Sequence, residues 1–219
     1  ELTNFSLVGD SILVDINELN LIERSGLNIK NFTTSVLYSP KLISLKDLNI
    51  NLNNSLLKAN HFELTMENGV DDFGDFLNKV IFNVELRNTS LALSDIAYFV
   101  PDIWGMTDYV NIVNLDISGP VNGMDLKNTE IRMLDTTLIK GDFQIPNLDD
   151  LDHAFIDEEI EIVRTSVSDI EKLNLMPFLD GKKYLDIPSN IDPANVITLK
   201  NGRFSGLLND FEVFGSITT

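Results

Sequence analysis

The chain has 219 residues, of which 43% are hydrophobic and 23% charged, a composition typical of a globular domain that buries a core. Its formal net charge of −18 disfavours binding to nucleic-acid phosphates and to anionic membrane surfaces. The absence of cysteine excludes disulfides, thiolate metal sites and cysteine nucleophiles.

Apolar and polar residues alternate with period two along most of the chain, from the run at Ile12–Ile16 to the run at Phe211–Ile217. Such alternation, broken by Asn, Gly, Asp or Pro, predicts strands of five to eight residues with one apolar face. We therefore expect a mainly β protein, an antiparallel curled sheet of successive hairpins that forms an open trough or a partly closed sandwich. The apolar residues expected to line its groove or core are Leu48, Ile50, Leu52, Phe62, Leu64, Val113, Leu115, Ile117, Ile131, Met133, Phe143, Ile145, Phe211 and Val213.

One stretch near the middle of the chain departs from this alternation and has helical spacing. Residues 70–80 place Phe73, Phe76, Leu77 and Val80 on one face of a helix. Asp71 or Asp72 is well placed to cap that helix.

Two further short helices are expected between strand groups. In residues 93–104, Ser94 is the expected N-cap and a proline ends the helix. In residues 165–178, Ser168 and Glu171 have the spacing of a capping box. Residues 181–194, which contain two prolines, are expected to form an irregular connection.

A phrase of Leu, Lys and then Asp or Asn occurs three times, at residues 44–50, 125–131 and 198–204, with a looser copy at 28–32. The first two copies are longer, since Leu45–Leu64 aligns with Leu126–Ile145, and each predicts a hairpin of strand, polar turn and strand. The Lys and the Asp or Asn of each phrase are expected to point outward where a strand begins. We expect one domain over residues 1–219, with sub-repeats at 27–92 and 108–219.

The sequence offers little support for a catalytic or metal site. His61 and His153 lack the spacing of a metal pair, and each is expected on the surface. The acidic stretch Asp149–Val163 lacks the glycine of a calcium loop, and we expect a solvated loop that leads into a strand with Ile160 and Ile162 inside. Trp104 is a candidate ligand anchor, although a lone Trp more often packs in a core or at its rim. We expect no cofactor and no enzymatic activity.

Four stretches together resemble the TamB branch of the AsmA-like envelope proteins of diderm bacteria. "SLKDLNINLNNSLLKANHFELTM" (Ser44–Met66) is similar to the recurring strand pairs of that family. "DDFGDFLNKVIFNVELRNTSLALSDIAYFVPDIW" (Asp71–Trp104) resembles its Phe-rich turn followed by strands and a short helix. "VNLDISGPVNGMDLKNTEI" (Val113–Ile131) and "NGRFSGLLNDFEVFGSITT" (Asn201–Thr219) resemble a strand–turn–strand unit and a closing signature of the family.

The resemblance implies a periplasmic fragment of a much longer protein that is anchored in the inner membrane. It implies a non-enzymatic role in outer-membrane protein assembly or in phospholipid transport through an apolar groove, with acyl lipid as the ligand. An outer-membrane barrel protein of the Omp85/TamA type is the partner expected of the whole protein. Two alternatives remain open from the residues: a surface-exposed β-sandwich used for binding or adhesion, and a glycan hydrolase that uses two carboxylates.

Overall fold

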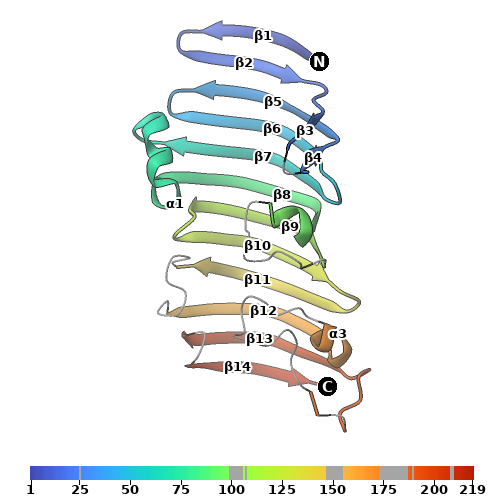
Figure 1. Ribbon diagram of the computed structural model, residues 1–219. Helices are drawn as coiled ribbons and strands as arrows, with labels where there is room; N and C mark the ends of the chain where they lie inside the picture. The colour runs from blue at the N-terminus through green and yellow to red at the C-terminus, as the bar shows by residue number, and fades with distance from the viewer. Residues whose placement is uncertain are drawn as a thin grey trace.

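The computed structural model describes residues 1–24, 26–98, 106, 108–146, 155–172, 187–188, 190–207 and 210–219, and of Phe211 only the backbone. Within these residues the protein is one large antiparallel sheet of 12 strands that does not close on itself, with a separate pair of two-residue strands (Figure 1). The expected mainly β, antiparallel and open architecture is therefore confirmed.

Every strand of the large sheet pairs with its neighbours along the chain, in the order β1-β2-β5-β6-β7-β8-β9-β10-β11-β12-β13-β14. The bounds of these strands are β1 Leu2–Val8, β2 Ser11–Ile16, β5 Asn31–Ser39, β6 Leu42–Asn51, β7 Leu56–Met66, β8 Val80–Ala92, β9 Tyr109–Pro120, β10 Met124–Met133, β11 Thr137–Ile145, β12 Ile156–Ser166, β13 Val196–Leu207 and β14 Asp210–Thr218. The small pair is β3 (Leu21–Ile22) and β4 (Asn28–Ile29). Both predicted hairpins are present, as β6–β7 and β10–β11.

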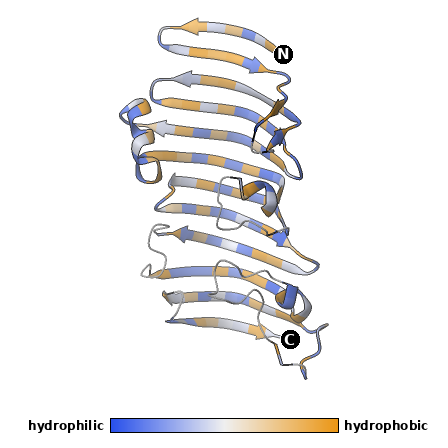
Figure 2. Ribbon diagram, viewed as in Figure 1, coloured by the Kyte–Doolittle hydropathy of each residue, from blue (hydrophilic) through white to orange (hydrophobic). Residues whose placement is uncertain are grey.

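Apolar and polar residues alternate along the strands (Figure 2), so the sheet has an apolar face and a polar face. Residues paired across antiparallel strands share a face, and the pairs Leu45–Phe62, Phe62–Val84 and Val84–Ile117 carry one apolar row across four strands. We call the face that contains this row the apolar face. The pairs Lys46–His61 and His61–Glu85 lie on the opposite, polar face.

The core lies on the apolar face at the middle of the sheet. Leu48, Ala59, Val84, Leu86, Ile112 and Leu115 form its buried cluster, contributed by strands β6 to β9. Leu48 is only 3% exposed, whereas Leu2 in β1 and Ile217 in β14 are each 64% exposed. The apolar face is thus buried at the centre of the sheet and open to solvent at both edge strands.

A row of residues with positive φ crosses the sheet near the middle of its strands. Asn4, Asp47, Asn88, Asn128 and Asn201 have φ values of 54, 51, 48, 52 and 46°. Each follows the pattern Leu-x-Asn or Leu-x-Asp, because the short polar side chain of Asn or Asp tolerates the left-handed conformation better than other L-residues. We call this row, with the residues beside it on each strand, the crease.

The crease coincides with breaks in strand register. Pairing between β5 and β6 passes from Ser35–Lys46 to Thr33–Asn49, so β6 carries an extra residue at Asp47. A residue inserted in this way bends the strand and increases its twist. Leu45 and Leu48, three positions apart, therefore share the apolar face.

From the sequence, the repeated Leu-Lys phrases are expected where strands begin. In the structure they mark the crease instead. Lys46, Lys127 and Lys200 do point outward, since all three are exposed. However, each lies inside its strand, several residues after the first. The looser copy at 28–32 shows no positive φ, whereas Leu2–Asn4 and Leu86–Asn88, which the sequence comparison missed, do belong to the set.

The first predicted helix is a 3-10 helix, η1 (Gly69–Asp75), followed by a short α1 (Phe76–Lys79). Val80, expected on the helical face, instead begins β8. Asp72 is buried and accepts hydrogen bonds from the backbone and side-chain amides of Asn68, which lower its pKa, so it fixes the preceding turn.

The other two helices are α2 (Leu93–Ile96) and α3 (Val167–Lys172), and their predicted caps are wrong. Ala92 occupies the N-cap of α2 and Ser94 lies inside that helix. At α3, the hydroxyl of Ser166 accepts a hydrogen bond from the backbone N–H of Asp169, so Ser166 caps the helix and Ser168 does not. Residues 99–105 and 173–186, where both helices were expected to end, lie outside the described residues.

The sub-repeats at 27–92 and 108–219 stay a prediction. They fall on β4–β8 and β9–β14. Apart from β4, which pairs with β3, these strands are consecutive in the large sheet, and β8 pairs with β9.

Candidate functional site

The apolar face is the main candidate site, and the strands bring most of the predicted residues onto it. Cross-strand pairs such as Ile43–Leu64, Ile131–Ile139 and Phe204–Val213 extend it from β6 to β14. The predicted residues that this pairing places there are Leu48, Ile50, Phe62, Leu64, Leu115, Ile117, Ile131, Met133, Phe143, Ile145 and Val213.

Three predicted residues are placed differently. Leu52 follows the last residue of β6 and lies in the turn that leads to β7. Val113 does not follow the alternation that places residues on the apolar face. The alternation changes phase in β9, because Ile112 and Leu115 both belong to the buried cluster and three positions separate them. Phe211 pairs with Gly206 through its backbone, and its side chain lies outside the described part of the chain.

The sequence list omitted several of the most buried residues of this face. Val84 and Leu86 are 2% and 7% exposed, and Ile112 is 5% exposed. The alternation of apolar and polar residues in β8 is sufficient to predict that Val84 and Leu86 lie on the apolar face. Ile112 is revealed only by the phase change in β9, where Val113 is an extra residue relative to β10, between the pairs Asn114–Glu130 and Ile112–Ile131.

Aromatic residues of the helical insert close one end of the apolar face between β7 and β8. The ring of Phe76 in α1 meets the ring of Phe82 edge-on, with centroids 5.8 Å apart. Phe82 in turn meets Phe62 at 6.3 Å, and Phe73 stacks on Phe76 at 5.9 Å. The insert therefore adds a hydrophobic stop where these strands meet η1 and α1 (Figure 1).

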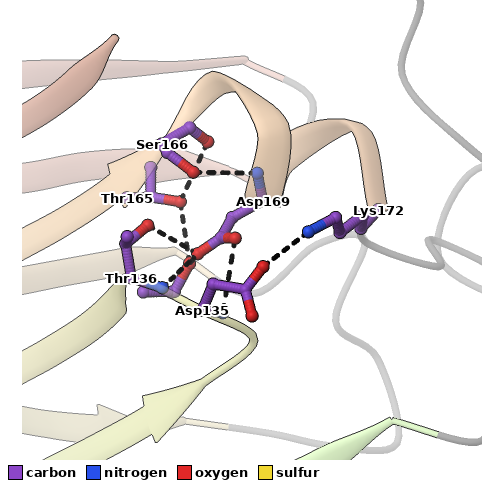
Figure 3. Close-up of polar contacts among 7 residues, drawn as sticks. Asp135, Thr136, Thr165, Ser166, Asp169 and Lys172 are labelled. Atoms are coloured by element: carbon purple, nitrogen blue, oxygen red, sulfur yellow. Dashed lines mark hydrogen bonds and ion pairs between the residues drawn. The ribbon is translucent and has the colours of Figure 1, made fainter. Parts of the chain in front are cut away.

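At the opposite end of the strands, the carboxylate of Asp169 ties helix α3 to the β10–β11 turn (Figure 3). It accepts hydrogen bonds from the backbone N–H of Thr136 at 2.7 Å and from the hydroxyls of Thr136 and Thr137 at 2.7 and 2.9 Å. Asp169 is 1% exposed. Beside it, Lys172 forms an ion pair with Asp135 at 2.6 Å. We call this arrangement the α3 latch.

The same arrangement occurs once more among the described residues. Asp95 of α2 is also 1% exposed and accepts hydrogen bonds from the backbone N–H of Asn54 at 2.7 Å and from its side-chain amide at 3.3 Å. Asn54 lies in the β6–β7 turn, so the carboxylate again reaches from the helix after the third strand to the turn between the first two. The two latches share the sequence Ser-Asp-Ile, at Ser94–Ile96 and Ser168–Ile170.

The α3 latch predicts a loss of stability in acid. Burial would raise the pKa of Asp169, but hydrogen bonds from Thr136, Thr137 and Asp135 outweigh it and lower the pKa to about 2. Because the folded pKa lies below the ordinary value of 3.8, the stabilisation is complete above about pH 4 and is lost as the pH falls through 2. Thermal unfolding should therefore show a steeper loss of Tm between pH 4 and pH 2 in the wild type than in Asp169→Asn. Parallel curves would contradict this assignment.

The polar face carries ion pairs between neighbouring strands. Glu130 binds Lys140 at 2.8 Å and Arg132 at 2.7 Å, and these hydrogen bonds hold its pKa below the usual value. His61 lies 3.5 Å from Glu63 on this face. Among the described residues, no group of three or more acidic or histidine side chains has the arrangement of a metal site. His153 and Trp104 lie outside the described residues.

The strand with Ile160 and Ile162 turns these two side chains to opposite faces. Ile160 pairs with Gly141 and Gly202, whereas Ile162 pairs with Lys140 and Lys200 on the polar face. The expectation that both lie inside is therefore wrong, because the crease adds a residue at position 161 in this strand.

Comparison with models of protein families, with curated proteins and with solved structures finds no match. Within the described residues, no helix has the length and apolar character needed to cross a membrane.

Proposed function

We propose that the protein is a non-enzymatic segment of a TamB/AsmA-like envelope protein and that its apolar face holds acyl chains of phospholipid. The observation that supports this proposal is the apolar face that extends across the 12-stranded open sheet. With strands about 4.8 Å apart, such a face extends roughly 50 Å. An apolar surface of that length has to be covered by another layer or by a ligand.

The charge distribution fits a surface exposed to water on one side and to hydrocarbon on the other. The pairs Arg87–Asp116 and Lys140–Glu130 lie on the polar face, whereas the apolar side chains line the opposite face. Each methylene group moved from water to this face contributes about 0.8 kcal/mol. On this proposal, the protein works in the periplasm, and an outer-membrane barrel of the Omp85/TamA type is the partner of the longer protein.

The two alternative functions have less support. A sandwich used for adhesion needs two packed sheets, and the strands β1 to β14 other than the β3–β4 pair form a single one. A glycan hydrolase needs a protonated carboxyl beside an ionised one. Burial raises the pKa of Glu158, but this residue pairs with Phe204 on the apolar face, while Glu159 pairs with Arg203 on the polar face.

Lipid capture is the test of the proposed function. Protein expressed in a diderm bacterium and purified without detergent should carry phospholipid in native mass spectrometry and should bind the neutral dye Nile red. Phe5→Lys and Leu7→Lys change apolar-face residues that are 63% and 66% exposed, so they should reduce binding several-fold without unfolding the protein.

Leu13→Lys is the matched control, since Leu13 is 38% exposed and lies in the adjacent strand on the polar face. It should leave lipid and dye binding unchanged. Absence of both lipid and dye binding in the folded wild type would refute the proposal. Equal effects of Leu13→Lys and Leu7→Lys would show that the apolar face is not the binding surface.

A further inference from the structure

At the crease, the strand register shifts between seven of the eleven adjacent strand pairs, whereas β2–β5, β6–β7, β8–β9 and β12–β13 keep a constant register. Between β9 and β10, pairing stops at Asp116–Lys127 and resumes at Asn114–Glu130. Between β13 and β14, pairing passes from Lys200–Ser216 to Arg203–Phe214. Regular pairing continues on both sides of each interruption, so the crease separates two stiff halves of the sheet by a line of weaker backbone contacts.

Three hollows lie along the crease on the polar face. The largest, of about 680 Å³, is lined at its rim by Asn128 and Asn201. A second of about 250 Å³ contains Asp47 and Asn88, and a third of about 380 Å³ contains Asn4. Every positive-φ residue of the crease therefore borders a hollow.

The polar contacts across the crease are ones that water can replace. Asp142 accepts a hydrogen bond from the backbone N–H of Asn128 at 2.9 Å and lies 3.4 Å from the ammonium of Lys127. Both side chains of this ion pair are 54% exposed. Exposed pairs of this kind contribute little to stability, so a change in the angle of the crease costs little on this face.

On the apolar face, buried side chains flank the crease and also lie at the strand ends beside η1, where Met66 and Val80 are 0% exposed. Leu48 directly follows Asp47, and Leu86 lies two residues before Asn88. Apolar residues further along the strands, such as Phe62 and Ile131, are only partly buried. A smaller angle at the crease would bring these outer residues of the two halves toward each other over the apolar face.

We propose that the crease is a hinge about which the two halves of the sheet open and close over an acyl chain. This inference rests on the proposed function for the identity of the ligand. The movement itself is a property of the sheet and can be measured without any ligand.

Distances between spin labels test the hinge directly, because the chain has no cysteine that would compete for the label. Lys79→Cys and Glu171→Cys place labels on exposed residues of α1 and α3, which lie at opposite ends of the strands (Figure 1). The doubly labelled protein with no other substitution should give a broad distribution of label-to-label distances by double electron–electron resonance. Palmitoyl lysophosphatidylcholine, added below its micelle threshold, should narrow the distribution and shift it to shorter distances.

Asn88→Val and Asn128→Val remove the residues that tolerate positive φ, since a β-branched side chain is disfavoured there. These two substitutions together should lengthen the mean distance without ligand and abolish the shift. Asn83→Val is the matched control, because Asn83 is exposed in the same strand β8 and pairs regularly with Glu63 and Ser118. It should behave as the wild type does.

Glycine at the same two positions tests the hinge even if the valine variant fails to fold. Asn88→Gly with Asn128→Gly keeps the left-handed conformation and should widen the distribution while retaining the shift. A distribution that is equally narrow with and without the lipid, in the wild type and in the glycine variant, would overturn the hinge. Lipid binding without a distance change would refute the hinge alone. A broad distance distribution that neither palmitoyl lysophosphatidylcholine nor Nile red narrows would refute acyl lipid as the ligand but would leave the hinge standing.

Discussion

Asp169→Ala should lower the free energy of unfolding by about 3 kcal/mol, because it leaves buried backbone and hydroxyl donors without an acceptor. The donors are the backbone N–H of Thr136 and the hydroxyls of Thr136 and Thr137, and the carboxylate that they contact is 1% exposed. Urea denaturation at neutral pH, followed by circular dichroism, measures this loss.

Glu171→Ala is the control for the α3 latch, since Glu171 is an exposed acidic residue of the same helix. We expect it to change the free energy of unfolding by less than about 0.5 kcal/mol. Asp95→Ala should resemble Asp169→Ala, because Asp95 has the same position in the other latch. The two losses should add, since the latches share no residue. A loss in Asp169→Ala no larger than in Glu171→Ala would show that the latch does not stabilise the fold.

Leu48→Ala should cost about 3 kcal/mol of unfolding free energy, the cost usual for removing a buried leucine side chain and leaving a cavity. Leu48 is 3% exposed and belongs to the buried cluster of the apolar face. A second effect should accompany the first, because Leu48 flanks the crease beside Asp47. The variant should take up more Nile red than the wild type, since its apolar face is less tightly packed.

Leu13→Ala is the matched change on the polar face, where Leu13 is 38% exposed. It should cost less than about 1 kcal/mol and leave dye uptake unchanged. Equal losses in Leu13→Ala and Leu48→Ala would mean that the two faces of the sheet are equally important for stability. The apolar face would then not be the core of the fold.

The alternation of apolar and polar residues was enough to predict the class of fold and most of the apolar face. It predicts the face of each residue correctly as long as the phase is unbroken, as at Phe62 and Leu64. The phase changes at the crease, and this change misplaced Val113 and Ile162. The Leu-x-Asn pattern signals the change in the neighbouring strands β8, β10 and β13, but neither β9 nor β12 contains it.

Local sequence rules did not predict the helix caps or the two latches. Ser168 and Glu171 have the spacing of a capping box, but Asp169 is used by a turn 33 residues earlier in the chain. This contact depends on three strands lying side by side, which the spacing of residues in one helix cannot reveal. The second Ser-Asp-Ile, at Ser94–Ile96, was the only trace of the arrangement in the sequence.

The order of strands in the large sheet has a consequence for how such a protein forms and changes in length. Because each strand pairs with the neighbours that precede and follow it, a strand can add to the sheet as soon as it emerges from a ribosome or a pore, without waiting for distant parts of the chain. Duplication of a hairpin would lengthen the apolar face by two strands and keep the direction of the last strand. A gain of one strand would reverse it, so lineages of such sheets should differ in length by whole hairpins.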